Sequence, residues 1–323
     1  MWNPGVHAIK NWQFNPNLII KSMIRFHHSK VLIPVDFSET SLLAIKHGAF
    51  IAQLTKADLY VLHVINTPLM SQNMFVPLVT IEDQTEIQGK VAQRLALLEQ
   101  EVKTEYGIGF HAIIKSGNPA KEITQTAQEI KASLVVMGTH GYSPIEEIMI
   151  GSVALKVIMR SPCPTMTMSH EASHKGYQRI VLPFDLTVNS KQKAHFAIEF
   201  AKKFNAAIYA VAMLGPDEGE YKAQMELVLH QVQVLAEDKG VPYHTDVLDH
   251  VKNRATGTVH YASQVGADLI MIMTDQDTEL SGLFLGPYSQ QVIHKSHVPV
   301  VAIRPEELYA AEDADLIPST SGN

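Results

Sequence analysis

An internal repeat constrains the fold of this chain more than any other feature of its sequence. The segment Lys-Val-Leu-Ile-Pro-Val-Asp at 30–36 returns as Arg-Ile-Val-Leu-Pro-Phe-Asp at 179–185, an offset of 149 positions (185 − 36). Farther along, Gly286 matches Gly151 at an offset of 135 (286 − 151). A length of 323 residues also fits about two domains. The repeat therefore predicts two homologous domains in tandem.

Each repeat has the pattern of an alternating α/β domain. In the first repeat, five short apolar runs bounded by turn residues alternate with helical patterns, at 31–35, 58–64, 110–115, 134–137 and 165–168. Such runs are typical of buried parallel strands, and strand–helix–strand units cross over right-handed. We predict a helix after the capping residues 38–41 and a long one over 82–106. The fold class expected is α/β, with two doubly wound five-stranded parallel sheets.

We divide the chain into five segments. They are an N-terminal extension, the first domain, a polar linker, the second domain and an acidic tail, at 1–28, 29–169, 170–178, 179–305 and 306–323. The extension has three interpretations: a flexible segment, a docking arm for a partner or membrane surface, or sequence upstream of a true start at Met23. The tail is expected to be solvated. The 14 extra residues of the first repeat (149 − 135) fall at 66–84, a candidate lid or contact surface.

Composition limits the classes of function. A net charge of −7 provides no basic field for a nucleic-acid backbone, so no nucleic-acid partner is expected. No apolar run is long enough for an integral membrane segment. The 16 histidines are scattered, and no metal site is expected. A single cysteine, Cys163, excludes an intrachain disulfide framework and favours a cytoplasmic location.

A glycine motif follows the fourth apolar run of the first repeat. The run ends at Gly138-Thr139-His140-Gly141, and Gly151-Ser152 follows ten residues later. We predict a strand, a tight loop, and then a helix over 153–160 whose N-terminus is capped by Ser152. Glycines at a helix N-terminus bring backbone N–H groups close to an anion, so the motif indicates a phosphate site. The spacing differs from that of the P-loop and of the dinucleotide-binding fingerprint.

With its spacing of G-x2-G-x9-G-S, this motif resembles the ATP-binding branch of the universal stress protein family. The resemblance spans both repeats and implies an adenine-nucleotide alpha-hydrolase-like, Rossmann-like fold. It also implies that the domains pair as an intrachain pseudo-dimer through their last strands, here 165–168 and 298–303. Whether the tandem unit forms a further homodimer is left open.

The resemblance also implies a nucleotide site in the first domain. Its cofactor would be ATP, or ADP or AMP, with Mg²⁺ accompanying ATP and held largely by phosphate and water. The adenosine end would be contacted by Pro34, Val35 and Asp36, with the Val64 backbone at the adenine edge and Gly117 at the border. The phosphates would be surrounded by Met137, Gly138, His140, Gly141, Gly151, Ser152 and Val153.

The second repeat lacks this motif. Met273, Thr274, Asp275 and Gln276 occupy the positions of the first glycine cluster, and Pro287 replaces the serine. A carboxylate near phosphate is unfavourable, and proline removes an N–H group. One working site is therefore expected, in the first domain. Asp185 and Gly286 remain, so a different ligand in the second domain is left open.

Several of these residues have a structural interpretation as well. Asp36 could contact a ribose or cap the next helix, and at Asp185 the cap is favoured. His140 could approach phosphate, act as an acid or base, or be an ordinary loop residue. No Lys or Arg lies inside the motif, so no catalytic residue is assigned.

The function expected is that of a nucleotide-binding regulatory protein of the stress response, with at most weak ATP hydrolysis. The alternatives are a slow ATPase or phosphotransferase using His140, and a module that binds a protein client while the nucleotide is structural. The client and the stress signal are not readable from the sequence.

Overall fold

The computed structural model describes residues 29–66, 81–139, 150–169, 176–185, 189–274 and 285–305. The predictions for the N-terminal extension, for most of the segment 66–84 and of the linker, and for the acidic tail lie outside these residues. His140 and Gly141 lie outside them as well.

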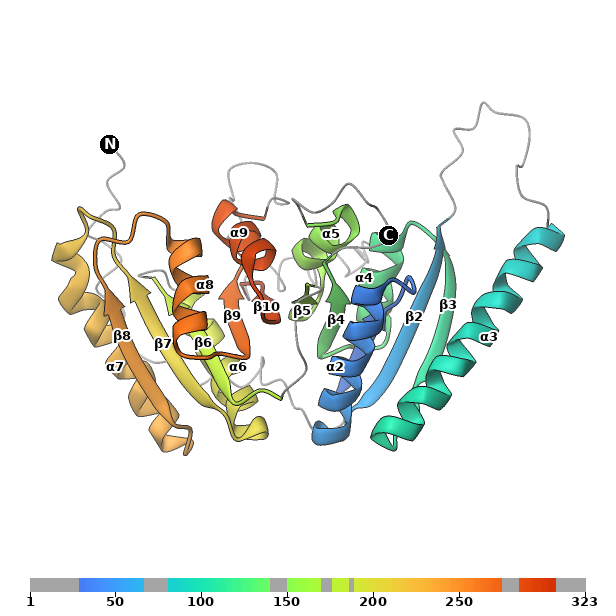
Figure 1. Ribbon diagram of the computed structural model, residues 1–323, viewed down its shortest axis with the longest axis horizontal. Coiled ribbons are helices and arrows are strands. Elements are labelled where there is room, and N and C mark those ends of the chain that lie inside the picture. The colour runs from blue at the N-terminus through green and yellow to red at the C-terminus, as the bar shows by residue number, and fades with distance from the viewer. Residues whose placement is uncertain are drawn as a thin grey trace, which may run out of the picture.

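The strands form a single ten-stranded sheet (Figure 1). The first domain contributes β1 (Lys30–Pro34), β2 (Asp58–Asn66), β3 (His111–Gly117), β4 (Leu134–Gly138) and β5 (Thr165–Met168). The second contributes β6 (Arg179–Phe184), β7 (Ala207–Met213), β8 (Tyr243–Leu248), β9 (Leu269–Met273) and β10 (Val300–Ile303). Their spatial order is β3-β2-β1-β4-β5-β10-β9-β6-β7-β8, and each half is parallel throughout. The predicted fold class is confirmed.

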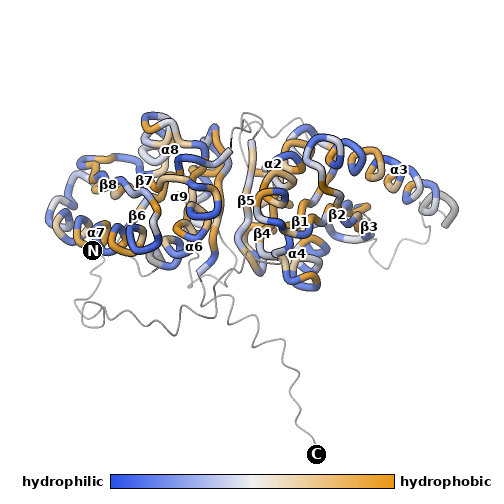
Figure 2. The backbone as a smooth tube through the Cα atoms, turned by 90° about the horizontal axis from the view of Figure 1, so that it is seen from below, coloured by the Kyte–Doolittle hydropathy of each residue, from blue (hydrophilic) through white to orange (hydrophobic). Residues whose placement is uncertain are grey.

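The helices repeat in the same way. The first domain has α2 (Glu39–Thr55), α3 (Ile81–Tyr106), α4 (Pro119–Glu129) and α5 (Ser152–Arg160). The second has α6 (Asn189–Phe204), α7 (Lys222–Asp238), α8 (Arg254–Gln264) and α9 (Pro287–Lys295), with a 3₁₀ turn η2 (Gly219–Tyr221) before α7. In Figure 2, α2 and α4 lie on opposite sides of the strands of the first domain. The strands are therefore covered on both faces, which explains their continuous apolar sequences.

Helix starts follow the local sequence. Ser38 caps α2, because its Oγ accepts a hydrogen bond from the Ser41 N–H at 3.3 Å. Asn118 caps α4 through the Lys121 N–H, and Asn253 caps α8 through the Thr256 N–H. These side chains satisfy backbone donors that the first helical turn leaves without intrahelical partners. The capping asparagine of α4 therefore recurs at the corresponding position of α8 (253 − 118 = 135).

The domains join through β5 and β10. These strands pair antiparallel, with Met166 opposite Val301, as the pseudo-dimer prediction requires. The pairing covers two edges that would otherwise present open hydrogen-bonding groups. The strand predicted over 298–303 begins at Val300, because Ser296 Oγ instead donates to the Val298 carbonyl in a turn.

Tyr177 fills the space between the two domains. It is 2% exposed, and its hydroxyl lies 2.7 Å from His47 Nδ1 of α2. Its ring meets Phe200 and Phe204 of α6 at centroid distances of 5.6 and 5.2 Å. The buried apolar cluster around it includes residues of both domains, so the domains share the core that surrounds Tyr177.

Candidate functional site

A cavity of about 300 Å³ opens at the carboxyl ends of β1, β2 and β4 in the first domain. This edge of a doubly wound sheet is where such folds bind ligands. Nine of the twelve residues predicted for the site line the cavity: Pro34, Val35, Asp36, Val64, Met137, Gly138, Gly151, Ser152 and Val153. The structure therefore brings together residues that are up to 119 positions apart (153 − 34).

Gly117 borders this group without lining the cavity. It ends β3 opposite Asn66, which does line the cavity, and its φ of +146° favours glycine. An added Cβ would lie 3.0 Å from Glu122 Oε1. The backbone conformation alone thus explains why glycine stands at position 117, because β3 must turn sharply into α4.

Asp36 neither caps the helix nor extends freely into the cavity. Its Oδ1 accepts hydrogen bonds from the Ser38 N–H at 3.0 Å and the Ser38 hydroxyl at 2.5 Å. Ser38 in turn is the helix cap, so Asp36 orients the cap while its carboxylate remains exposed. The intervening Phe37 has a φ of +66°, an unusual conformation for a bulky residue. The Phe37 ring, packed on His63 with Arg94 over it, holds this turn in place.

The glycine motif is anchored by backbone hydrogen bonds at Thr139 and at Gly151. The Thr139 N–H donates to the Met168 carbonyl, and the Gly151 N–H donates to the Thr139 carbonyl at 2.8 Å. Gly138 has a packing role, because an added Cβ would lie 2.6 Å from Thr40 Oγ1. Gly151 has φ −57° and ψ 143°, angles that any residue adopts. Its small size therefore matters for what approaches it and not for its backbone conformation.

The predicted capping role of Ser152 is wrong by one position. The N-cap of α5 is Gly151, and Ser152 is the first helical residue, with an exposed side chain. Since glycine has no side chain to offer, no side-chain hydrogen bond caps this helix. The start of α5 therefore borders the cavity, and Gly151 provides no side-chain acceptor for its first N–H groups.

Sequence reasoning missed seven residues that also line the cavity: Ser41, Leu62, Asn66, Pro119, Ile123, Thr139 and Ala154. Leu62 and Asn66 belong to the end of β2, and Pro119 and Ile123 to the start of α4. Their position follows from the parallel order of the strands. That topological rule could have found them, whereas the glycine motif marks only Thr139 among them.

Among the described residues that line this cavity, one side chain is charged, that of Asp36. Lys115, at the end of β3, is engaged elsewhere, because its Nζ lies 2.8 Å from Glu129 Oε2 and 4.0 Å from Glu122 Oε2.

Among the residues that the structure describes, no group of three or more His, Cys, Asp or Glu could hold a metal ion. None of the helices in the described part of the chain is long and apolar enough to cross a membrane.

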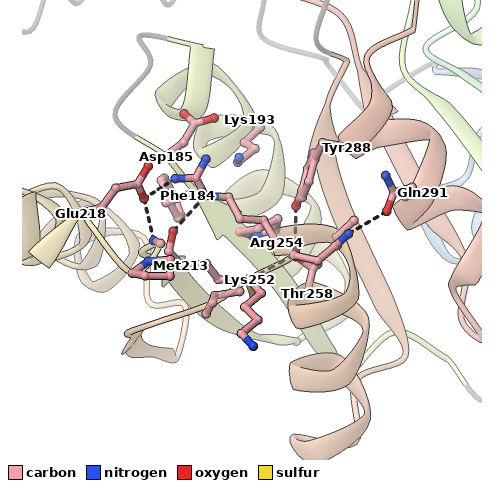
Figure 3. Close-up of a pocket in the computed structure, with 16 residues that line it drawn as sticks. Phe184, Asp185, Lys193, Met213, Glu218, Lys252, Arg254, Thr258, Tyr288 and Gln291 are labelled. Carbon is pink, nitrogen blue, oxygen red and sulfur yellow. Dashed lines mark hydrogen bonds and ion pairs between the residues drawn. The ribbon is translucent and has the colours of Figure 1, made fainter. Parts of the chain in front are cut away.

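The second domain has a larger cavity, of about 500 Å³, at the corresponding sheet edge. It differs in its charges, which come from Asp185, Lys193, Glu218, Lys252 and Arg254 (Figure 3). The predicted capping role of Asp185 takes a different form here. Its Oδ1 accepts a hydrogen bond from the Ser190 hydroxyl in the first turn of α6, at 2.6 Å.

Arg254 reaches across this second cavity. Its Nε donates to the Met213 carbonyl at 3.1 Å, and its Nη2 pairs with Glu218 (Figure 3). Glu218 also accepts from the Gly215 N–H at 2.7 Å. These donors, the Arg254 guanidinium first, lower the pKa of Glu218 below its usual value. The Glu218 carboxylate is therefore ionised near neutral pH.

The fold and the site define a class: a tandem of doubly wound α/β domains with a cavity at the carboxyl edge of each half-sheet. The model of the Universal stress protein family matches residues 27–168 and 176–304. The chain therefore belongs to the universal stress protein family, as a tandem member.

Curated relatives agree with this assignment, and a solved structure shares the fold. A universal stress protein of Methanocaldococcus jannaschii is 32% identical over 154 residues, which cover 46% of this chain and 89% of the relative. Universal stress protein YxiE of Bacillus subtilis is 32% identical over 143 residues, 43% of this chain and 97% of the relative. The crystal structure of a universal stress protein from Archaeoglobus fulgidus superposes with a TM-score of 0.70 at 20% identity. It covers 86% of this chain and 98% of that one, and thus shares the tandem fold.

Proposed function

We propose that the first domain, residues 29–169, binds one adenine nucleotide and that this chain is a nucleotide-binding regulatory protein of the stress response. The observation that carries the proposal is the cavity at the carboxyl edge of β1, β2 and β4, lined by nine of the residues predicted for the site. Its volume of about 300 Å³ lies at the lower end of the usual range for small-molecule sites.

The phosphates are placed at the start of α5. Its first N–H groups have no side-chain cap, and the helix dipole adds roughly half a positive charge there. Gly138 and Gly151 remove side chains from this wall of the cavity. His140 and Gly141 complete the proposed phosphate loop.

The adenosine is placed at the ends of β1 and β2. The exposed carboxylate of Asp36 is held by Ser38 and is an acceptor for a ribose hydroxyl. Val64 offers its backbone to the adenine edge, while Val35 and Met137 supply apolar contacts. Mg²⁺ with ATP is expected to be bound largely by phosphate and water, because the described lining residues offer it a single carboxylate, that of Asp36.

A regulatory role is favoured over catalysis. Phosphoryl transfer requires cationic groups on the transferred phosphate, and among the described residues that line the cavity none is Lys or Arg. The chain is proposed to act in the cytoplasm, with a protein client of unknown identity.

Gly151→Leu tests the phosphate assignment. The leucine side chain would enter the wall of the cavity where phosphate must approach, so ATP binding measured by calorimetry should fall at least about tenfold, about 1.4 kcal/mol. Gly89→Leu on α3 is the matched control, because an added Cβ meets nothing within 4 Å there. Retained affinity in Gly151→Leu, with an unchanged circular dichroism spectrum, would place the phosphates elsewhere.

Binding and turnover assays on the unmodified chain and on His140→Ala separate the three functions. If the unmodified chain turns over ATP steadily and His140→Ala abolishes this turnover with nucleotide binding intact, the ATPase or phosphotransferase is supported. If the unmodified chain binds nucleotide without turnover, the regulatory protein is supported. If it binds no adenine nucleotide but still retains a client, the interaction module is supported.

A further inference from the structure

The cavity of the second domain is built differently from its counterpart. Arg254 stands at the position that Pro119 occupies in the first domain, and each of the two directly follows a capping asparagine. Ala44 is replaced by Lys193 (193 − 44 = 149), and Val153 by Tyr288 (288 − 153 = 135). Lys252 stands at the position of Gly117 (252 − 117 = 135). The second cavity has therefore gained three cationic side chains and an aromatic one at positions where the first domain has small or apolar residues.

In the second domain, the Arg254 side chain occupies the backbone edge that corresponds to the proposed adenine position of the first domain. Met213 corresponds to Val64 (213 − 64 = 149), and its carbonyl accepts the hydrogen bond from Arg254 Nε. Figure 3 shows the Arg254 side chain extended between Met213 and Glu218. A base docking on that backbone edge would have to displace this contact, so an adenine nucleotide is a poor fit.

The charges of the second cavity favour an anion. Three basic side chains line it, Lys193, Lys252 and Arg254, against two acidic ones. Both carboxylates already accept hydrogen bonds from the protein: Glu218 from Gly215 and Arg254, and Asp185 from Ser190. Arg254 shares its charge with Glu218 in this pair, so the basic excess of the lining is one side chain, three against two.

Lys193 is a deeply placed cation. It is 4% exposed, its Nζ lies 5.1 Å from the centre of the Phe184 ring, and it donates to Ser190 Oγ at 3.4 Å. This ammonium group would attract an anion in the adjoining cavity, because charges interact more strongly where water is scarce. The N-terminal ends of α8 and α9 border the same cavity through Asn253 and Tyr288 and add dipoles of the same sign.

Apolar groups shape the rest of the cavity. Phe184, Met213, Val251 and Tyr288 contribute to its lining. The Tyr288 hydroxyl is hydrogen-bonded to Thr258 at 3.0 Å, which fixes the ring (Figure 3). A ligand that fits this lining has a compact apolar body in addition to a charged head.

We infer that the second domain binds a small organic anion, consisting of one oxyanion head, carboxylate or phosphate monoester, on a compact apolar body. The head lies by Arg254 and Lys193, and the body packs on Phe184 and Tyr288. This site is separate from the nucleotide site proposed for the first domain.

Methionine methyl groups report on the two cavities separately. Met213 lines the second cavity and Met137 the first. The full chain, labelled with ¹³C-methyl methionine, is titrated with benzoate, phenyl phosphate and the uncharged benzyl alcohol, and Met213→Leu and Met137→Leu assign the signals. Benzoate or phenyl phosphate should shift the Met213 signal saturably, and the tighter of the two identifies the head group. Benzyl alcohol should bind at least about tenfold more weakly, because it lacks the charge-assisted hydrogen bonds.

Arg254 variants test the role of the cation. Arg254→Gln should weaken the anion about tenfold, whereas Arg254→Lys should stay within about threefold of the unmodified chain. Arg179→Gln is the matched control: its Nη1 also donates to a backbone carbonyl, that of Val265, but at the opposite edge of the sheet. Equal binding of benzyl alcohol, an unchanged affinity in Arg254→Gln, or shifts confined to Met137 would each overturn the inference.

Discussion

Replacing Tyr177 by alanine tests whether the two domains form one cooperative structure. The side chain is 2% exposed and has four aromatic neighbours, at centroid distances of 5.2 to 6.1 Å. Large aromatic-to-alanine changes in a core cost about 3–5 kcal/mol. Because the lost contacts come from both domains, we expect the upper part of that range, and a fall in the melting temperature of about 10 °C.

The assay is urea and thermal unfolding, followed by circular dichroism. Tyr177→Phe removes only the hydroxyl near His47 and should cost about 1 kcal/mol. Phe110→Ala is the control for general loss of core, since this residue is 7% exposed and precedes the outer strand β3, far from the junction. It should lower stability while the transition stays single, whereas Tyr177→Ala should broaden or split the transition. A loss below about 1 kcal/mol in Tyr177→Ala would refute the shared core.

Two further predictions concern titratable groups. Burial raises the pKa of the Cys163 thiol to about 12. A disulfide reagent at pH 8 should therefore modify this thiol at least roughly a hundredfold more slowly in the folded chain than in the urea-unfolded chain. Equal rates would show that the thiol is accessible. The lowered pKa of Glu218 means that its contacts with Arg254 and Gly215 stabilise the fold above pH 4.5, and that this stabilisation is lost as the pH falls through the folded-state value. Glu218→Gln should therefore cost at most about 1 kcal/mol in urea unfolding at pH 7, because the pair is partly exposed. The cost should shrink as the pH is lowered below 4.5, and a deficit that does not shrink on acidification would contradict the ion pair.

Much of the fold was predictable because it depends on local patterns repeated twice. The apolar runs fix the buried strands, and Ser38 and Asn118 cap their helices through contacts within three residues. The pairing of β5 with β10 came from the family resemblance, since nothing local in Thr165–Met168 specifies a partner strand.

The candidate site was predictable where a motif marks it and not where distant segments meet. Gly138 and Gly151 stand out in the sequence, but the packing of Gly138 on Thr40 depends on how α2 lies against β4. Ser152 was misplaced because a capping serine and a first-turn serine look alike when glycine precedes them. The position of Arg254 across the Met213 carbonyl joins residues 41 positions apart and had no signature in the sequence.

The most direct test of the central claim is to identify the small molecules that the purified, undialysed protein carries. The protein is denatured, and the released molecules are identified by mass spectrometry and quantified per chain. The account predicts about one adenine nucleotide per chain, held by the first domain and lost in Gly151→Leu. A chain that carries no nucleotide and also rejects added ATP in calorimetry would contradict it.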